Sequence, residues 1–314
     1  MRKIFFITGL LLVSFFGHTQ ILEINQPLFT DEPFFNPAFI KANKVKSITG
    51  SISSKKINDI IRTKGLDYFY EFNDDGTLLM QLASNYSKGI KDSSIVTYCY
   101  NENGSISLKR KSDSYGYYSH HYKYDADGNI MLQTYCRDEN RYECKNKFEL
   151  KNQFVIVADS FSYQKTDPSQ TKKFYYNAYK KVYKEQINYY DEYGYLVEEY
   201  TRFIIGNNKK KITYEYDEMG RLSKKHTFTD IAQGKKETEV YTYDEVGNVL
   251  DIKFYQNEQH KTTKEFLYDK NMLLYAQLIK DIESDFLRII QYRYTFWGEN
   301  KYVDYLPSDS VSTQ

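Results

Sequence analysis

The stretch Tyr122-Lys-Tyr124-Asp-Ala-Asp-Gly128-Asn-Ile130 recurs along the chain. Close copies read Tyr98-Cys-Tyr100-Asn-Glu-Asn-Gly104-Ser-Ile106, Tyr214-Glu-Tyr216-Asp-Glu-Met-Gly220-Arg-Leu222 and Tyr241-Thr-Tyr243-Asp-Glu-Val-Gly247-Asn-Val249. Self-similarity at a regular spacing is the signature of a repeat architecture. With the second aromatic residue as the anchor, ten copies follow one another at a spacing of about 26 residues, at Phe72, Tyr100, Tyr124, Leu150, Tyr176, Tyr190, Tyr216, Tyr243, Tyr268 and Tyr294.

Each column of this alignment has its own chemistry. One position after the anchor the residue is Asp or Asn in eight of the ten copies, and four positions after it glycine occurs in seven, although the chain holds only 15 glycines. Asp or Asn at a first corner can bond the backbone two residues on, and glycine supplies the positive φ that closes a type I turn with a G1 bulge. Each copy therefore predicts a β-hairpin.

The aliphatic residue six positions after the anchor completes the hairpin. In the predicted geometry it faces the anchor across the two strands, on one side of the sheet. The aromatic residue two positions before the anchor, as at Tyr122, Tyr214 and Tyr241, lies on the same side because side chains alternate along a strand.

Ten such units predict an all-β fold of 18 to 20 antiparallel strands in a long meander. An open sheet of that length does not stay flat, so we expect the sheet to curl into an open spiral, a partial barrel or an elongated sheet. The interval between Tyr176 and Tyr190 is half a unit. It predicts either a change of direction in the sheet or a border between two halves.

The segments outside the repeats differ in composition. Met1-Arg2-Lys3, an apolar run from Ile4 to Phe16 and the small residues Gly17 and Thr19 have the layout of a signal peptide over residues 1–19. Residues 20–44 read as a cap segment in which Asn36-Pro37 predicts the start of a short helix, residues 45–306 as the β-hairpin repeat domain, and residues 307–314 as a loose polar tail. We therefore expect export to the periplasm, the cell surface or the extracellular space, with no membrane span in the mature chain.

The net charge limits the classes of partner that we expect, and the cysteine count limits the number of disulfides. The net charge of +1 favours neither nucleic acid nor an anionic membrane. Three cysteines are too few for a disulfide-built scaffold. Cys136 and Cys144 flank a polar segment where a hairpin tip would place them on facing strands, so either a disulfide joins them or they are two ordinary strand cysteines.

The recurring Tyr-Asp-x-x-Gly-x-Leu, as at Tyr216 to Leu222, resembles the YD repeat of the RHS and teneurin-like proteins over residues 65–300. The resemblance implies an exported protein built from long β-hairpin sheets, with carbohydrate binding as the linked activity. The large members roll the sheet into a shell, and some enclose a C-terminal toxin. This chain lacks their Pro-rich core signature and any C-terminal toxin domain, so it resembles a small stand-alone member of a Gram-negative envelope.

Signals for enzyme chemistry are few. His120 and His121 are adjacent and would point to opposite faces of a strand, and the chain has no His-Glu-x-x-His, Cys-x-x-Cys or Gly-x-Ser-x-Gly. Asp125-Ala-Asp127-Gly128-Asn129 lacks the spacing of a calcium loop and falls on the predicted turn. We therefore expect no enzyme, no metal and no cofactor.

Tyrosine is the feature that could carry recognition, because its flat face stacks on sugar rings and its hydroxyl makes hydrogen bonds. Cross-strand packing explains the anchors, so the off-frame Tyr117, Tyr118, Tyr193 and Tyr195 are the candidate ligand-stacking residues. The favoured function is a non-enzymatic binding or scaffold module for a glycan or another envelope protein. The alternatives are an adhesion or toxin-associated shell fragment and a carboxylate-based enzyme on the concave face of the sheet.

Overall fold

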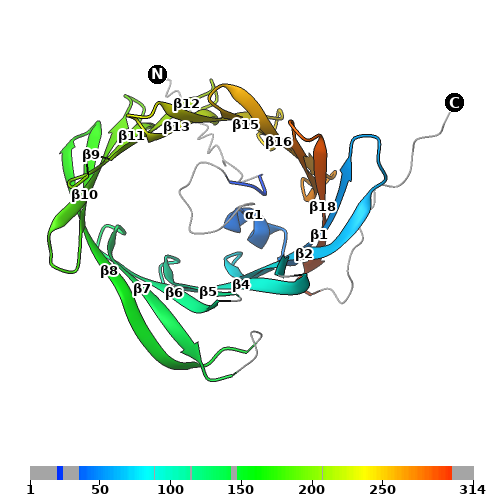
Figure 1. Cartoon of the computed structure of the whole chain (residues 1–314), viewed down its shortest axis with the longest axis horizontal. Helices are drawn as coiled ribbons and strands as arrows, with labels where there is room; N and C mark the ends of the chain where they lie inside the picture. Colours follow the sequence, from blue (N-terminus) through cyan, green and yellow to red (C-terminus); the bar gives the residue numbers. More distant parts are fainter. Residues whose placement is uncertain are drawn as a thin grey trace, which may run out of the picture.

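A computed structural model describes residues 20–23, 35–87, 89–113, 115–142, 147–206 and 208–298. Eighteen strands form one antiparallel meander in which each strand pairs with the next along the chain, and β1 also pairs with β18. The sheet therefore closes into a barrel, drawn as a ring in Figure 1. The strands are β1 (Val45–Lys56), β2 (Arg62–Phe72), β3 (Leu78–Ser87), β4 (Ile90–Tyr100), β5 (Ile106–Asp113), β6 (Gly116–Tyr124), β7 (Ile130–Asn140), β8 (Leu150–Asp167), β9 (Gln170–Tyr176), β10 (Val182–Tyr190), β11 (Leu196–Phe203), β12 (Lys209–Tyr216), β13 (Leu222–Asp230), β14 (Lys235–Tyr243), β15 (Val249–Gln256), β16 (Gln259–Tyr268), β17 (Leu274–Asp281) and β18 (Phe286–Phe296).

Closure corrects the expectation of an open spiral, a partial barrel or an elongated sheet. β1 and β18 pair over their length, from Val45 opposite Phe296 to Lys56 opposite Phe286. An open sheet would leave unpaired backbone groups along both of these strands, and pairing them satisfies those groups. Sequence patterns report local turns and faces, whereas closure depends on contact between the first and last strands.

The predicted hairpin turns are present at the alternate connections. The N–H of Gly128 donates to the carbonyl of Asp125 at 3.2 Å, and the Asp125 carboxylate accepts from the N–H two residues on. The anchors also face their aliphatic partners across the strands, as Tyr124 faces Ile130 and Tyr243 faces Val249. These turns and pairs confirm the local hairpin geometry.

A hydroxyl ladder joins neighbouring hairpins. The anchor Tyr243 donates to the carbonyl of Leu222 at 2.7 Å, and Leu222 begins the strand after the preceding turn. Six further tyrosines make the same type of bond to the preceding hairpins: Tyr100, Tyr124, Tyr163, Tyr216, Tyr268 and Tyr294. Each bond connects one hairpin to the next, and all but the bond of the exposed Tyr163 satisfy a buried or half-buried hydroxyl.

Three copies of the repeat depart from the expected frame. The copy at Tyr294 lies on β18, the last described strand, which pairs with β1. Leu150 does not precede a turn but begins β8, an 18-residue strand. The turn at Asn177 has the expected hydrogen bond, from the N–H of Lys180 to the Asn177 carbonyl. It joins β9 to β10, however, and the alternation of the meander places it at the opposite end of the barrel from the other turns of this type. The half-length interval thus corresponds to the single strand β10 with a turn of this type at each end, and the meander continues through it in unchanged strand order.

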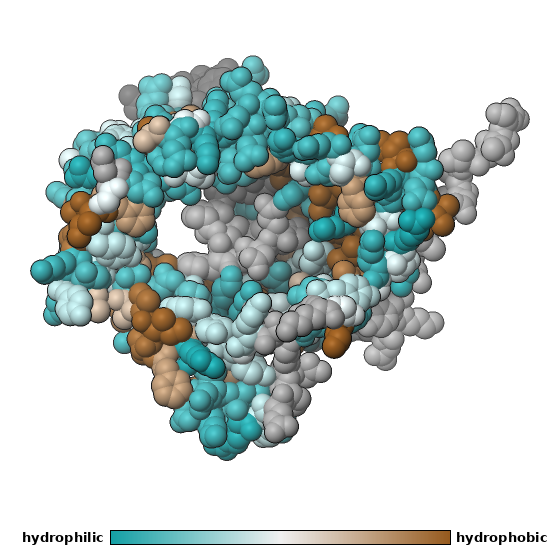
Figure 2. All heavy atoms as spheres, viewed as in Figure 1, coloured by the Kyte–Doolittle hydropathy of each residue, from teal (hydrophilic) through white to brown (hydrophobic). Residues whose placement is uncertain are grey.

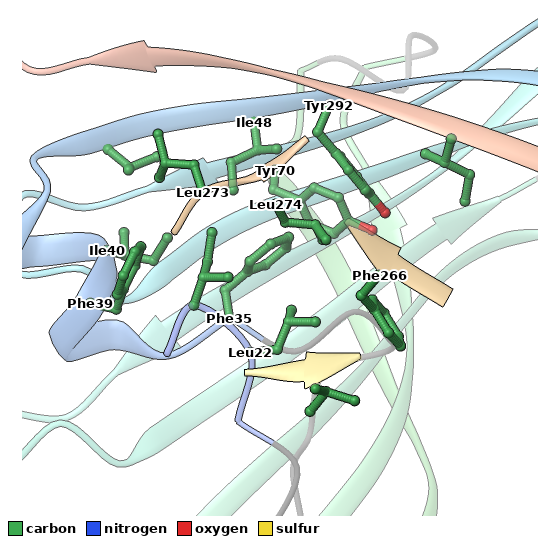
Figure 3. Packing of buried hydrophobic residues seen from close by; sticks show 14 of the residues in the cluster. Leu22, Phe35, Phe39, Ile40, Ile48, Tyr70, Phe266, Leu273, Leu274 and Tyr292 are labelled. Carbon is green, nitrogen blue, oxygen red and sulfur yellow. The ribbon is translucent and has the colours of Figure 1, made fainter. Parts of the chain in front are cut away.

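The N-terminal segment, defined here as residues 20–23 and 35–43, lies inside the barrel (Figure 1). It contains α1 (Pro37–Ala42), whose N-cap is Asn36 and whose first position is Pro37. Phe35 packs edge-on against Tyr70 and Phe72 of β2, with ring centroids 4.9 and 5.6 Å apart. Figure 3 shows this segment meeting side chains from several strands, so the main hydrophobic core fills the lumen on one side of the barrel.

The described residues contain no helix that is long and apolar enough to cross a membrane. The expected signal peptide (residues 1–19), the tail (307–314) and Cys144 lie outside the described residues.

Candidate functional site

The inner face of the barrel is identified by its register with the N-terminal segment. Tyr70 of β2 contacts Phe35 and pairs with Gln81, and the pairing then runs through Val96 of β4 to the strands beyond. Directly opposed residues share a face, and so do residues two apart on one strand, so these pairs place Lys109, His120 and Gln133 on the inner face as well. The lumenal wall can therefore be followed strand by strand around the ring.

The wall has two unlike halves. The main core cluster draws its buried residues from the N-terminal segment and the loop at Leu273, and from β1, β2 and β13 to β18, which we call the filled half. None of these cluster residues lies on β3 to β12, which we call the open half, although the inward Gln81, Val96, Tyr98 and Tyr122 of β3, β4 and β6 are buried as well. Figure 2 shows the ring hollowed on the side of β9 and β10, away from α1. Half-buried inward side chains of β8, β9 and β10 therefore face this hollow.

A lysine–aromatic cluster lies on the open half, on β8, β9 and β10. The Nζ of Lys173 lies 4.3, 5.4 and 4.9 Å from the ring centroids of Phe161, Tyr163 and Tyr175. The Nζ of Lys184 lies 3.7 Å from the centroid of the same Tyr175 ring. Register explains the meeting, because Lys173 is directly opposite Tyr163, and Tyr175 is directly opposite both Phe161 and Lys184.

Burial shapes the electrostatics of this cluster. Loss of hydration, followed by the charge of Lys184, lowers the pKa of Lys173 to about 8. The pKa of Lys184 is also lowered, mainly by loss of hydration. Burial raises the pKa of Tyr175 well above its ordinary value, so its hydroxyl stays protonated. Near neutral pH the wall thus presents two poorly hydrated ammonium groups beside uncharged phenols.

Amides and a carboxylate extend the cluster toward β11. The hydroxyl of Tyr175 donates to the amide oxygen of Gln186 at 2.8 Å, and the amide nitrogen of Gln186 donates to Glu199 at 2.8 Å. Tyr214 of β12 also donates to Glu199. The result is a wall with ring faces, cations and hydrogen-bonding groups side by side, which suits non-covalent binding of a polar ring-containing molecule.

A separate cleft lies at the end of the barrel where β1 leads into β2, opposite to α1. It has a volume of about 320 Å³ and is lined by Lys64, Tyr68, Tyr86, Phe286 and Arg288, among others. The Nζ of Lys64 lies 6.0 Å from the Phe286 ring centroid. None of the residues that line this cleft belongs to the lysine–aromatic cluster.

The four predicted stacking tyrosines do not form one platform. Tyr117 and Tyr118 are neighbours on β6, so they lie on opposite faces of the sheet. Tyr118 points inward and stacks on Tyr135 with centroids 5.9 Å apart. Tyr117 points outward, packs against Phe148 at 5.1 Å and accepts a hydrogen bond from Asn140. Only Tyr118 thus belongs to the lumenal wall.

Tyr193 and Tyr195 lie at the turn between β10 and β11. Tyr193 is 79% exposed at the corner of that turn. Tyr195 packs on the anchor Tyr216 with centroids 4.8 Å apart, so one of its faces is occupied. Their role as ligand-stacking residues stays a prediction, at a place distant from Tyr117 and Tyr118.

The histidines and Cys136 occupy structural positions. His120 faces inward and stacks on Tyr135 at 4.6 Å, while His121 faces outward, 3.2 Å from the Oγ of Ser119. Ser119 is fully buried, so this pair offers no accessible nucleophile. Cys136 is buried on the same outer face, and its pairing with Cys144 stays a prediction. Among the described residues, no group of three histidine, cysteine or acidic side chains could hold a metal ion.

Sequence reasoning missed Lys173 and Lys184. Both lie in polar strands of ordinary composition, and the half-length interval breaks the frame between them. The signal that could have found them is parity: once Tyr163 and Tyr175 are placed on the inner face, Lys173 shares that face by the two-residue alternation.

Comparison with known proteins does not establish a family. No family model matches the chain, and no curated protein matches it. Among solved structures, the chain is similar to a porin-like protein from Bacteroides uniformis (12% identity, TM-score 0.41, 80% of this chain and 98% of that chain). It is also similar to a porin-like protein from Bacteroides vulgatus (12% identity, TM-score 0.32, the same coverage) and to the Photorhabdus luminescens Tc holotoxin pore (10% identity, TM-score 0.18, 74% of this chain and 19% of that chain). The YD-repeat resemblance stays a hypothesis.

Proposed function

We propose that this protein is an exported, non-enzymatic binding module that holds its ligand in the open half of the lumen, against the lysine–aromatic cluster. The observation that carries the proposal is the contrast within the barrel: the N-terminal segment covers the inner face of one half, whereas half-buried rings, amides and cations on β8 to β11 face the hollow. A carbohydrate is the favoured ligand, because its ring stacks on tyrosine and its hydroxyls bond amides and carboxylates.

The inward carboxylates support a binding role rather than an enzymatic one. Glu199 accepts hydrogen bonds from Tyr214 and Gln186, and Glu239 accepts one from Tyr241 and pairs with Lys225 at 3.4 Å. General acid–base catalysis requires a carboxyl group that is aimed at the substrate. Here the carboxylates organise the wall.

The outer face supports a barrel that works in water. Glu185 and Arg202 are directly opposed on β10 and β11 and lie 2.8 Å apart, and Glu215 and Lys224 are opposed on β12 and β13 at 3.1 Å. A lipid-facing barrel carries an apolar band on this face. We expect the chain beginning at Gln20 to elute as a single species without detergent in size-exclusion chromatography. Recovery only in detergent micelles would contradict a barrel that works in water.

A steric block of the lumen tests the site itself. Thr201 of β11 faces inward, opposite Gln186, so Thr201→Trp should fill the open half without changing its charge. Thr213 of β12 faces outward, opposite His226, and Thr213→Trp is the matched control. Oligosaccharides that bind the wild-type chain on a glycan array should bind Thr213→Trp normally and Thr201→Trp at least tenfold more weakly, as expected when a bulky side chain blocks a contact worth over 1.4 kcal/mol. Equal binding by both variants would exclude the lumen as the site.

A further inference from the structure

Lys173 and Lys184 form a like-charged pair inside the lumen. Both ammonium groups lie over the same ring, Tyr175, and the charge of Lys184 acts on Lys173. Within the described part of the chain, neither lysine has an ion pair with a carboxylate, while at least seven other lysines on the barrel wall pair with Asp or Glu. Poorly hydrated cations held together without a direct ion pair are unfavourable in a folded protein.

The surrounding carboxylates are charged, but neither forms an ion pair with the two lysines in the described part of the chain. On β8, the charge of Asp159 favours the charged form of Lys184, while its carboxylate bonds the Tyr183 hydroxyl. On β11, Glu199 accepts hydrogen bonds from Gln186 and Tyr214 instead of pairing with a lysine. On β12, Lys210 adds a third positive charge that acts on Lys184, and it lies opposite the inward Thr201. The remaining titratable neighbours, Tyr163 on β8 and Tyr175 on β9, are uncharged at neutral pH because burial raises the pKa of both.

We infer that the ligand of this site carries an anionic group, and that it is a saccharide bearing carboxylate or sulfate rather than a neutral sugar. The inference rests on the proposed function and adds the chemical class. An anion placed at Lys173 and Lys184 supplies the direct ion pair that neither lysine makes with the wall, while the rings of Phe161, Tyr163 and Tyr175 form the apolar floor around it.

The test uses oligosaccharides in matched pairs. Oligogalacturonate is compared with its neutral methyl ester, and a sulfated oligosaccharide with its desulfated form, by isothermal titration calorimetry on the chain beginning at Gln20. The acidic member of at least one pair should bind at least tenfold more tightly than its neutral partner. Equal affinity of both members would overturn the inference and leave the proposed function intact. Binding by neither member of any pair would overturn both.

Substitutions locate the charge effect. Lys173→Met and Lys184→Met should each reduce the preference for the acidic member severalfold. Lys172 is the matched control: it precedes Lys173 on β9 and faces outward, opposite Gln164, so Lys172→Met should leave the preference unchanged. Retained preference in both lumenal variants, with normal folding by circular dichroism, would overturn the inference. An equal loss in Lys172→Met would do the same.

The pH dependence gives a readout that a structural role would not produce. The pKa of Lys173 is about 8, so its positive charge is lost as the pH rises through this value. The affinity for the acidic oligosaccharide should therefore fall between about pH 7 and about pH 9, before ordinary lysines titrate near 10.4. The Lys173→Met variant should lack this step, and an unchanged step in that variant would contradict the assignment to Lys173.

Discussion

The filled and open halves of the barrel are built from the same type of hairpin, but the inner face of the hairpin has a different role in each half. In the filled half, the inward positions before the anchors carry Phe266 and Tyr292, which the cluster around the N-terminal segment buries to 4% and 2% exposure. In the open half this position differs between strands: Tyr98 and Tyr122 are buried, whereas the position before Tyr190 carries Asn188, whose neighbours Gln186 and Lys173 are polar and half-buried. A repeated hairpin thus makes either core or binding wall, and the choice depends on what covers its inner face.

The largest expected difference between the halves is in the stability lost when a phenylalanine of each half is replaced by alanine. Phe35 is 5% exposed and packs against two rings of β2, so Phe35→Ala should destabilise the barrel by about 3 to 5 kcal/mol. Phe161 lies half-buried on the open half, so Phe161→Ala should cost about 1 kcal/mol. Urea unfolding of the two variants makes the comparison. Similar losses would mean that the two halves are equally packed.

A pair of glycines tests whether the N-terminal segment docks where the structure has it. Gly76 and Gly104 occupy the same turn position with φ of +89° and +81°, so alanine should cost each about 1 to 2 kcal/mol. At Gly76 an added Cβ would lie 2.0 Å from the Pro37 carbonyl oxygen of α1, whereas at Gly104 nothing lies within 4 Å. Gly76→Ala should therefore lose about 2 kcal/mol more than Gly104→Ala in thermal unfolding. Equal losses would show that α1 does not rest on this turn.

The smallest expected effect is a gain in stability in the open half. The pKa of Lys173 is lower in the folded chain than the ordinary lysine pKa of about 10.5, so the unfolded chain binds more protons than the folded chain between pH 8 and pH 10.5. Lys173 therefore destabilises the folded state fully below pH 8, and progressively less as the pH rises to 10.5. After allowance for solvent exposure, Lys173→Met should stabilise the protein by about 1 kcal/mol at neutral pH. The gain should vanish near pH 10.5 in urea titrations. Lys172→Met should show no such pH dependence.

The sequence predicted the local turn geometry correctly but did not predict the closure of the sheet. Asp125 and Gly128 define a turn through their own bonding and backbone preferences, so this level could be predicted from local chemistry. Closure could not, because it depends on β1 meeting β18 across more than two hundred residues. The long strand β8 replaced the expected turn after Leu150, where the copy lacks both the acidic residue and the glycine.

The lysine–aromatic cluster was the feature that the sequence predicted least well. Exposure of a tyrosine outside the repeat frame does not say which face of the barrel it occupies, and Tyr117 and Tyr118 were separated for that reason. Lysine in a strand is ordinarily solvent-exposed, so nothing in the composition distinguished Lys173 from Lys172. Their difference is one of face, and it follows only from the register of β8, β9 and β10.

Cysteine accessibility tests the division of the lumen most directly. In a background with Cys99→Ser and Cys144→Ser, the variants Thr201→Cys in the open half and Ile48→Cys in the filled half are labelled with a maleimide under native conditions. Both positions face inward, but Ile48 is fully buried by the core. We predict fast labelling at position 201 and labelling on the order of a hundredfold slower at position 48, because the latter requires local opening of the core. Equal rates at the two positions would contradict a barrel with one filled and one open half.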